Sequence, residues 1–263
     1  MKADRLFDVT GHGALVTGAA SGLGLAMAEV MAANGARVTM LDVDAAGLDQ
    51  AVSRLRAAGG AVDVAVVDVR DQAALRGAVD ACAARWGRLD AVFANAGISA
   101  GPGFATGLSS LETVSLDAWD NVVAINLTSI LVTIQAAAAH MKPRRSGRIV
   151  VTASIAGLRA EPLVGYAYAA TKAGVINLVR QAAVELAPSG VTVNAIAPGP
   201  FLTNIAGGRL RDPAVVRQFA DMVPLGRIAS TEEIKGLALL LGSPASSFIT
   251  GTVIPIDGGT TAV

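Results

Sequence analysis

The stretch VTGAASGLGLAMAEVMAANGARVTMLD, Val16–Asp42, decides the fold that this chain is expected to adopt. A β-branched run at its start predicts a strand, and Gly18, Gly22 and Gly24 predict a tight turn into a helix near residues 22–34. A second β-branched run ends the stretch. Because strands joined by a helix pair in parallel with a right-handed crossover, the stretch predicts a βαβ unit.

The same alternation of short β-branched runs and Ala/Leu-rich segments continues along the chain. The expected strands are Gly13–Thr17, Arg37–Leu41, Val62–Val67, Leu89–Ala94, Arg148–Thr152, Val191–Ala197 and Thr252–Ile256. The expected helices lie near residues 22–34, 44–58, 71–86, 115–141, 166–187 and 230–242. We therefore predict an α/β fold with one domain over residues 1–263, a Rossmann-type, doubly wound parallel sheet of about seven strands with helices on both faces.

Two long irregular stretches, Ile98–Val114 and Pro198–Pro224, both follow strands and interrupt this pattern. In doubly wound sheets, ligands bind beyond the carboxyl ends of strands, so these two stretches are expected to border the site. The second, about residues 198–224, is expected to act as a substrate loop or lid. Its apolar and basic side chains are Phe201, Leu202, Ile205, Phe219, Met222, Arg209, Arg211 and Arg217.

The composition excludes several classes of protein. Apolar residues make up 52% of the 263 residues, which excludes disorder, and 21 basic residues balance 21 acidic ones, which argues against nucleic acid and membrane partners. The first dozen residues lack a secretory signal, and the single cysteine, Cys82, suits a reducing compartment, so a cytoplasmic protein is expected. The uncharged run Asn121–Ala139 holds several polar residues and predicts a buried helix.

The glycine turn predicts a nucleotide site. Its spacing, G-x-x-x-G-x-G, lets backbone approach a pyrophosphate at a helix N-terminus, although strand-to-helix glycines also serve packing alone. Asp42 ends the second strand, where a carboxylate can accept hydrogen bonds from the adenosine ribose hydroxyls. No Arg or Lys occupies Ser21 or Val43, so NAD is favoured over NADP. Asp68 either contacts the adenine or leads into the next helix.

The chain's only two tyrosines, Tyr166 and Tyr168, lie near Lys172. Tyr168 and Lys172 are four residues apart in an expected helix, so their side chains share one face, which Tyr166 cannot. A charge about 4 Å away in a medium of dielectric about 20 would lower the phenol's pKa of about 10 by roughly 3 units. Tyr168 is therefore a candidate acid–base group, against the alternative of a packed tyrosine beside a solvated lysine.

With these motifs the sequence resembles the short-chain dehydrogenase/reductase family, in its single-domain branch, from about Thr10 to Gly259. The resemblance rests on residues 17–24 (TGAASGLG), Asn95-Ala96-Gly97, Asn126, Ser154, Tyr168-x-x-x-Lys172, Pro198-Gly199 and Asp257-Gly258-Gly259. It implies the catalytic residues Asn126, Ser154, Tyr168 and Lys172. It implies a cofactor site of Gly18, Ser21, Gly22, Leu23, Gly24, Asp42, Asp68, Val69, Asn95, Ala96, Gly97, Tyr168, Lys172, Pro198, Gly199 and Thr203.

In that family the tyrosine exchanges a proton with the substrate oxygen while hydride passes between substrate carbon and nicotinamide. By resemblance, Ser154 would hold the same oxygen, Lys172 would bind the nicotinamide ribose, and Asn126 would support a water-linked proton path. Thr203 falls where the family often contacts the carboxamide. A buried asparagine also needs hydrogen-bond partners for structural reasons alone, so Asn126 keeps that second interpretation.

The expected activity is NAD-dependent oxidation of a secondary alcohol, or reduction of its ketone. A 3-oxoacyl or 3-hydroxyacyl thioester is the alternative substrate, and a non-catalytic nucleotide sensor the alternative class, although Ser154, Tyr168 and Lys172 would serve no purpose in a sensor. Sugar epimerases with a similar Tyr-Lys pair add a C-terminal domain for which this chain is expected to be too short. We expect no metal, since His12 and His140 have no partners at ligand spacing. A homotetramer is expected, with a dimer as the alternative.

Overall fold

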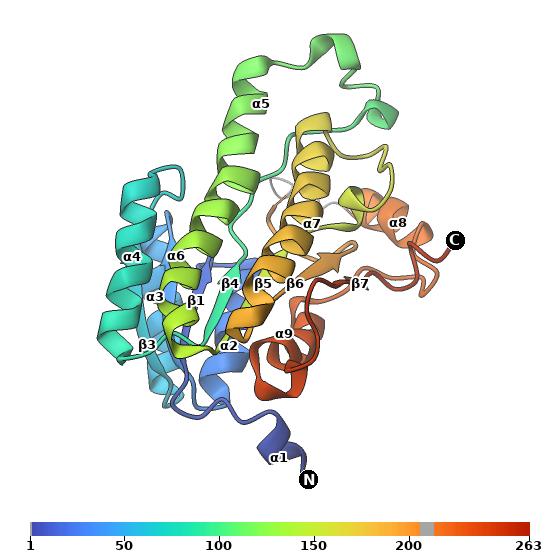
Figure 1. Cartoon of the computed structure of the whole chain (residues 1–263). Helices are drawn as coiled ribbons and strands as arrows, with labels where there is room; N and C mark the ends of the chain where they lie inside the picture. The colour runs from blue at the N-terminus through green and yellow to red at the C-terminus, as the bar shows by residue number, and fades with distance from the viewer. Residues whose placement is uncertain (1, 206–212) are drawn as a thin grey trace.

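The computed structural model describes residues 2–205 and 213–263, and within them seven parallel strands form one sheet in the order β3-β2-β1-β4-β5-β6-β7 (Figure 1). The strands are β1 (Gly13–Thr17), β2 (Arg37–Asp42), β3 (Ala61–Val66), β4 (Ala91–Ala94), β5 (Gly147–Thr152), β6 (Val191–Pro198) and β7 (Val253–Ile256). The predicted fold class is therefore confirmed. The strand order reverses direction between β1 and β4, the point where such sheets bind ligands.

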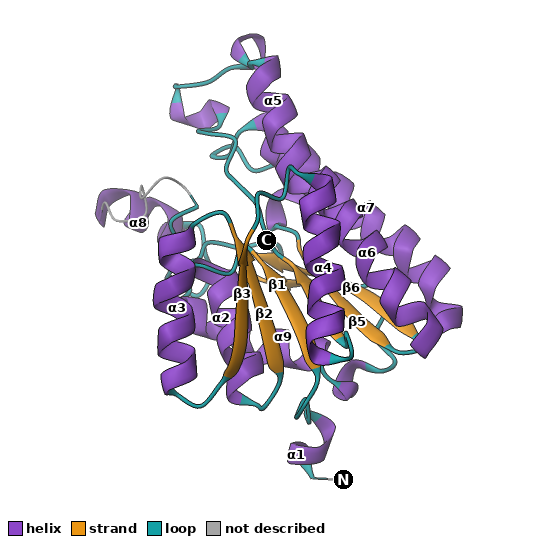
Figure 2. Ribbon diagram, turned by 90° about the vertical axis from the view of Figure 1, so that its left-hand side faces the viewer, coloured by secondary structure: helices purple, strands orange, loops and turns teal. Residues whose placement is uncertain are grey.

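Helices cover both faces of the sheet (Figure 2). One face packs against α4 (Gln72–Trp86), α6 (Ser129–Arg144) and α7 (Tyr166–Leu186), and the other against α2 (Gly22–Ala33), α3 (Ala45–Ala57) and α9 (Lys235–Gly242). Neighbouring strand residues feed opposite cores: Leu15 belongs to the first and Val16 to the second, and both are fully buried. This burial on both faces explains the continuous apolar runs in the sequence.

A helical segment of 29 residues, Leu116–Arg144, crosses one face of the molecule. It consists of α5 (Leu116–Val123), one π-helical turn η3 (Ala124–Thr128) and α6. Among the described residues it alone is long and apolar enough to span a membrane, but 56% of its most apolar window is buried inside the protein. The segment packs beside α4 and α7, as expected of a core helix.

The structure departs from the prediction chiefly in the two irregular stretches. The first contains the 3-10 turns η1 (Phe104–Thr106) and η2 (Leu111–Thr113), and the second contains α8 (Pro213–Asp221). Residues 206–212 of the expected lid, with Arg209 and Arg211, lie outside the described residues. The remaining short helices are α1 (Ala3–Leu6), η4 (Ile155–Gly157), η5 (Ala187–Ser189), η7 (Thr231–Ile234) and η8 (Pro244–Ser246).

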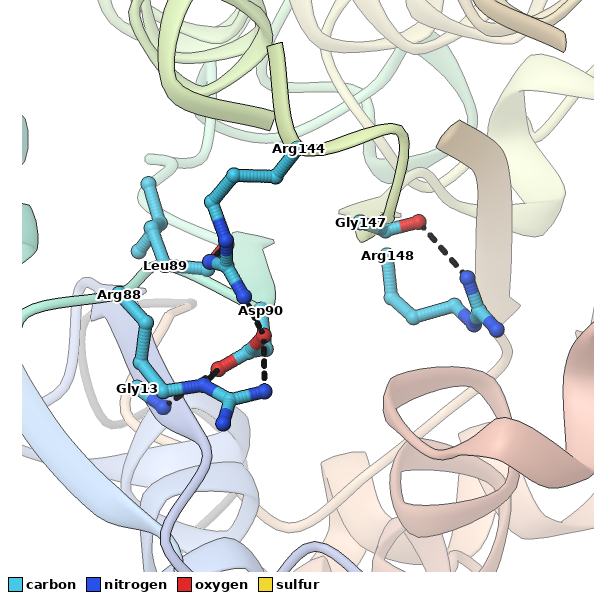
Figure 3. A network of polar contacts seen from close by, with 7 residues as sticks. All are labelled: Gly13, Arg88, Leu89, Asp90, Arg144, Gly147 and Arg148. Atoms are coloured by element: carbon cyan, nitrogen blue, oxygen red, sulfur yellow. Dashed lines mark hydrogen bonds and ion pairs between the residues drawn. The ribbon is translucent and has the colours of Figure 1, made fainter. Parts of the chain in front are cut away.

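An ionic network joins the amino ends of the central strands (Figure 3). The Asp90 carboxylate accepts hydrogen bonds from Gly13 N at 2.9 Å, from Arg88 Nε, and from Arg144 Nη2 at 2.9 Å. Burial opposes ionisation of this 5%-exposed residue, but the hydrogen bonds from Arg88, Gly13 and Arg144 outweigh it and lower the pKa of Asp90. The network thus ties β1, β4 and the end of α6 together.

Candidate active site

A cavity of about 630 Å³ opens at the carboxyl ends of the strands, across the reversal between β1 and β4. It collects side chains and backbone from the glycine turn, from the ends of β2 to β6, and from α7. The predicted site residues that line it are Gly18, Ser21, Gly22, Leu23, Asp42, Asp68, Val69, Asn95, Ala96, Gly97, Ser154, Tyr168, Lys172, Pro198, Gly199 and Thr203. Gly24 and Asn126 lie behind this lining.

The glycine turn presents backbone to the cavity. Gly18 and Gly22 have φ angles of 66° and 58°, which other L-residues rarely adopt, and they carry the chain from β1 into α2. Ser21 is the N-cap of α2, but its side chain makes no capping hydrogen bond, so the first N–H groups of the helix are left for a ligand. Gly24 packs directly against the Gly18 carbonyl and the Asn95 amide, and any side chain there would push the turn away.

Asp42 is held at the mouth of the cavity by backbone. Its Oδ2 accepts from Ala20 N at 2.9 Å and its Oδ1 from Asp44 N at 3.0 Å. These two bonds fix the carboxylate at the end of β2, beside the glycine turn. Asp44, not Asp42, caps α3, since its side chain accepts from Gly47 N.

Asp68 lies beside an arginine in the cavity lining. Its carboxylate pairs with Arg70, whose Nε and Nη2 lie 2.9 and 2.6 Å from Oδ2, and the side-chain hydrogen bond from Arg70 lowers its pKa. Arg70 Nη1 also donates to Asn121 Oδ1 at 3.2 Å. Arg70 and Asn121 line the cavity and were not singled out from the sequence, because the contact joins residues far apart in the chain.

A chain of hydrogen bonds fixes the ends of three neighbouring strands. Thr17 Oγ1 accepts from Asn95 N and Ala96 N, and the Asn95 amide donates to the Thr17 carbonyl. Thr152 Oγ1 donates to Asn95 Oδ1 at 2.9 Å, and the Thr152 carbonyl accepts from Lys172 Nζ at 2.7 Å. β1, β4, β5 and α7 are thereby locked at the floor of the cavity. Thr17 and Thr152 are positioning residues that the sequence alone did not reveal.

Ser154 is brought to Tyr168 by a close approach of backbone. η4 follows Ser154, and a Cβ at Gly157 would lie 2.5 Å from the Lys172 carbonyl carbon. Only glycine allows η4 to press this closely on α7. The result is a side-chain hydrogen bond between Ser154 and Tyr168 at the cavity wall.

Lys172 lies one turn after Tyr168, with its Nζ over the phenol ring, 5.6 Å from the ring centroid. Burial raises the pKa of Tyr168, against the opposing hydrogen bond from Ser154, and burial lowers the pKa of Lys172 to about 8. The expectation that Lys172 brings the Tyr168 pKa toward neutrality is therefore wrong for this arrangement. The lysine is itself 2% exposed and is directed to the Thr152 carbonyl, so desolvation dominates both groups.

Asn126 lies in the π-helical turn, fully buried. Its Oδ1 accepts from Ile98 N at 2.8 Å and its Nδ2 donates to the Ile98 carbonyl at 2.9 Å. Both ends of the amide are thus used to hold the segment after β4. Ile98 and Ile125 line the cavity on either side of this contact, so Asn126 shapes the site from behind.

The rest of the wall is mainly apolar, with one ion pair. Arg159 Nε and Glu161 Oε1 are 2.9 Å apart. The apolar part comes from Leu163, Val164, Phe201, Ile205, Phe219 and Met222.

Side chains typical of metal sites do not converge in the described residues: no three of His, Cys, Asp and Glu gather to hold an ion there. His140 instead pairs with Asp80, 2.6 Å from Nε2 to Oδ1, between α6 and α4.

Comparison with known proteins identifies near relatives along almost the whole chain. A family model described as enoyl-(acyl carrier protein) reductase matches residues 18–261. Cis-4-hydroxycyclohexanecarboxylate dehydrogenase of Sinomonas cyclohexanicum is 41% identical over 255 residues, which cover 95% of this chain and 96% of that protein. Cyclohexanol dehydrogenase of Rhodococcus sp. (strain TK6) is 41% identical over 267 residues, which cover 95% of this chain and 96% of that protein.

Solved structures share the fold in detail. A gluconate 5-dehydrogenase from Burkholderia cenocepacia J2315, in complex with NADP and tartrate, superimposes with a TM-score of 0.91 at 32% identity, covering 100% of both chains.

Proposed function

The chain belongs to the short-chain dehydrogenase/reductase family and is an oxidoreductase acting on CH–OH groups, and on that premise we propose that it oxidises secondary alcohols with NAD through Tyr168. The observation that carries this proposal is the convergence of Ser154, Tyr168 and Lys172 on a cavity whose opposite end is the glycine turn. Comparisons assign the reaction class, and the roles of these residues are our inference.

The residues around the cavity fit a nicotinamide dinucleotide. Gly18, Gly22 and the uncapped start of α2 form a cradle for a pyrophosphate, Asp42 faces the place of a ribose, and Thr203 lies close to Gly22 across the cavity. When bound, the dinucleotide would supply the acceptor for the hydride that leaves the alcohol carbon. Asp68 and Val69 would border the adenine, with Arg70 held in place by Asp68.

The proton steps fall to this chain's own side chains. The Tyr168 oxygen takes the hydroxyl proton as the carbon–oxygen bond of the alcohol becomes a carbonyl, and Ser154 hydrogen-bonds the same substrate oxygen. The charge of Lys172, 5.6 Å from the centroid of the phenol ring, is proposed to offset part of the burial that raises the pKa of Tyr168. Asn126 holds the segment after β4 in position through its hydrogen bond with Ile98. We also propose that Asn126 supports a water-linked proton path.

NAD is the proposed cofactor, in preference to NADP. The Asp42 carboxylate would repel a 2′-phosphate and would lose its ribose hydroxyl partners. We expect NADP to give a much lower kcat/KM than NAD, and Asp42→Ala to narrow the difference. Equal kcat/KM values for the two cofactors in the wild-type protein would contradict this preference.

Alicyclic secondary alcohols are the proposed substrates, by analogy with the two relatives that are 41% identical. The apolar part of the wall, from Leu163, Val164, Phe201, Ile205, Phe219 and Met222, suits a ring. The alternative is a 3-oxoacyl thioester, favoured by the description of the matching family model. The test is a panel of cyclohexanols, polyols and 3-hydroxyacyl thioesters, followed by absorbance of the reduced cofactor; thioesters as the best substrates would reverse the order.

The whole chain is proposed to act as one cytoplasmic catalytic domain, with residues 198–224 as the substrate loop. We further propose a homotetramer, with a dimer as the alternative, because α5 and the outer surfaces of α6 and α7 expose large apolar side chains. These are Leu116, Leu131 and Val184, with exposed fractions of 76%, 39% and 78%. Light scattering at micromolar concentration measures the mass, and a monomer would contradict the proposal.

A further inference from the structure

Arg159 is the one arginine that lines the substrate half of the cavity among the described residues. It follows η4, on the segment between Ser154 and Tyr168. Elsewhere in the lining, Arg70 lies beside Asp68 at the end of β3, and Lys172 donates to the Thr152 carbonyl. Among the described lining residues, Arg159 is therefore the arginine that an anionic group on a substrate would meet in this half of the cavity.

Arg159 already has acceptors on several sides. Its Nε lies 2.9 Å from Glu161 Oε1, and its Nη1 donates to the Val263 backbone oxygen at 3.2 Å. Its charge also reaches Asp257: burial opposes ionisation there, but hydrogen bonds from Thr261 and Gly259, together with Arg159, lower the pKa of Asp257. The guanidinium joins the segment after β5 to the segment after β7, and its charge is shared among Glu161, the Val263 oxygen and Asp257.

Glu161 adds a negative charge to the same wall. Its side chain is only 13% exposed, against 37% for Arg159, so the carboxylate is the more enclosed member of the pair. A substrate carboxylate next to this pair would meet the attraction of Arg159 and the repulsion of Glu161 together. It would lose water in a cavity with an apolar wall without gaining a free cation.

We propose that the Arg159–Glu161 ion pair makes this cavity selective for uncharged alicyclic secondary alcohols and ketones over carboxylated ones of the same size. The inference rests on the proposed function and deepens it, since the two relatives of equal identity carry names of both kinds, an unsubstituted cyclohexanol and a hydroxycyclohexanecarboxylate. Glu161 is the specificity-determining residue, acting through Arg159 and through its own charge.

The test compares two probes that differ in charge but hardly in shape, cis-4-hydroxycyclohexanecarboxylate and cis-4-hydroxycyclohexanecarboxamide. With NAD at neutral pH, the wild-type protein is expected to give a kcat/KM for the amide about tenfold or more above that for the carboxylate. This factor is the repulsion expected from one nearby charge, reduced because the pair is partly exposed to solvent. In Glu161→Gln the ratio should fall by about tenfold, through a gain on the carboxylate, because Arg159 becomes available.

Two further variants isolate the cause. Glu161→Gln combined with Arg159→Met should lose the gain on the carboxylate, because no cation is released. Glu185→Gln removes the same charge from an exposed position near the end of α7 and should leave the ratio unchanged. The wild-type comparison needs no variant, so it decides the question even where Glu161→Gln fails to fold.

The inference is overturned by a carboxylate that is as good as the amide in the wild-type protein. It is also overturned by a ratio that does not move in Glu161→Gln, or that moves equally in Glu185→Gln. A wild-type protein that binds NAD but oxidises neither probe nor cyclohexanol would remove the proposed function itself, and the inference with it.

Discussion

Lys172 is a cation in surroundings that disfavour a cation. It is 2% exposed, its described hydrogen-bond partner is the Thr152 carbonyl, and burial lowers its pKa to about 8. A buried lysine costs stability whenever it is charged, which agrees with the functional role proposed for Lys172 beside Tyr168. We therefore expect replacement of Lys172 by an apolar residue to have opposite effects on stability and on activity.

Lys172→Met should abolish most activity yet change the pH dependence of stability. Between pH 8 and pH 10.5 the unfolded chain still binds the proton that the folded protein has released, so the wild-type free energy of unfolding rises with pH. The stability of the variant relative to wild type should therefore fall by about 3 kcal/mol from pH 7 to above pH 10. Urea unfolding at several pH values measures this, with the exposed Lys142→Met as control. A difference that does not depend on pH would contradict a buried ammonium.

The two tyrosines should separate chemistry from packing. Tyr168→Phe removes the oxygen that is proposed to exchange the proton and keeps the ring, so kcat should fall by about two to four orders of magnitude while the affinity for the proposed cofactor, NAD, survives. Tyr166 has its ring 6.3 Å from that of Phe104, and Tyr166→Phe should retain most activity. The measurement is kcat at saturating NAD for both variants. Equal losses, or a larger loss at Tyr166, would place the acid–base group elsewhere.

At the scale of elements, the site depends on how closely η4 approaches α7. The approach is set by Gly157, whose backbone meets the Lys172 carbonyl, and it brings Ser154 to Tyr168. The glycine turn and the Tyr-Lys pair are local patterns, whereas this contact joins two segments of different elements. The contact between η4 and α7 thus positions Ser154 and Tyr168, which no single sequence motif shows.

Gly157→Ala should separate Ser154 from Tyr168. The new Cβ would lie 2.5 Å from the Lys172 carbonyl carbon, so η4 must shift, at a cost of about 1–3 kcal/mol in stability and at least about tenfold in kcat. Gly77→Ala is the matched control, since it lies within α4 with nothing within 4 Å of its Cβ and should be neutral or slightly stabilising. Thermal unfolding and kcat report both effects, and an unaffected kcat in Gly157→Ala would show that η4 does not set the geometry.

Most elements could be predicted because their signals are local. The strand runs and glycine turn fixed β1, α2 and β2 to within about a residue, as expected for periodic segments with clear ends. The π-helical turn at Asn126 could not be predicted, because it accompanies a contact with Ile98, 28 residues away in the chain. Arg70 was missed for the same reason, since Asn121 lies 51 residues further on. Charge pairing and burial across elements were the missing information.

At the scale of the whole molecule, the two ends of the sheet have different roles. The carboxyl ends of the strands carry the cavity, and the amino ends carry the ionic network of Asp90 (Figure 3). The family and the reaction class predicted from the motifs are confirmed by the comparisons. The residues of those motifs lie at the carboxyl ends of the strands. The network at the other end is expected to contribute stability without touching the chemistry.

Asp90→Asn tests this division. The amide keeps the shape of the carboxylate but leaves Arg88 and Arg144 without their counter-charge, so the free energy of unfolding should fall by roughly 2–4 kcal/mol at pH 7. Because the folded protein lowers the pKa of Asp90, the stability that its charge provides is present at neutral pH and is lost as the pH falls through that lowered pKa. The difference in the free energy of unfolding between the two proteins should therefore be largest near neutrality and shrink in acid, whereas exposed Asp49→Asn should show little difference at any pH.

At a temperature where both proteins remain folded, kcat/KM should be the same within about twofold, because the network and the cavity lie at opposite ends of rigid strands. A loss of kcat/KM in Asp90→Asn without a loss of stability would show that the two ends of the sheet are coupled.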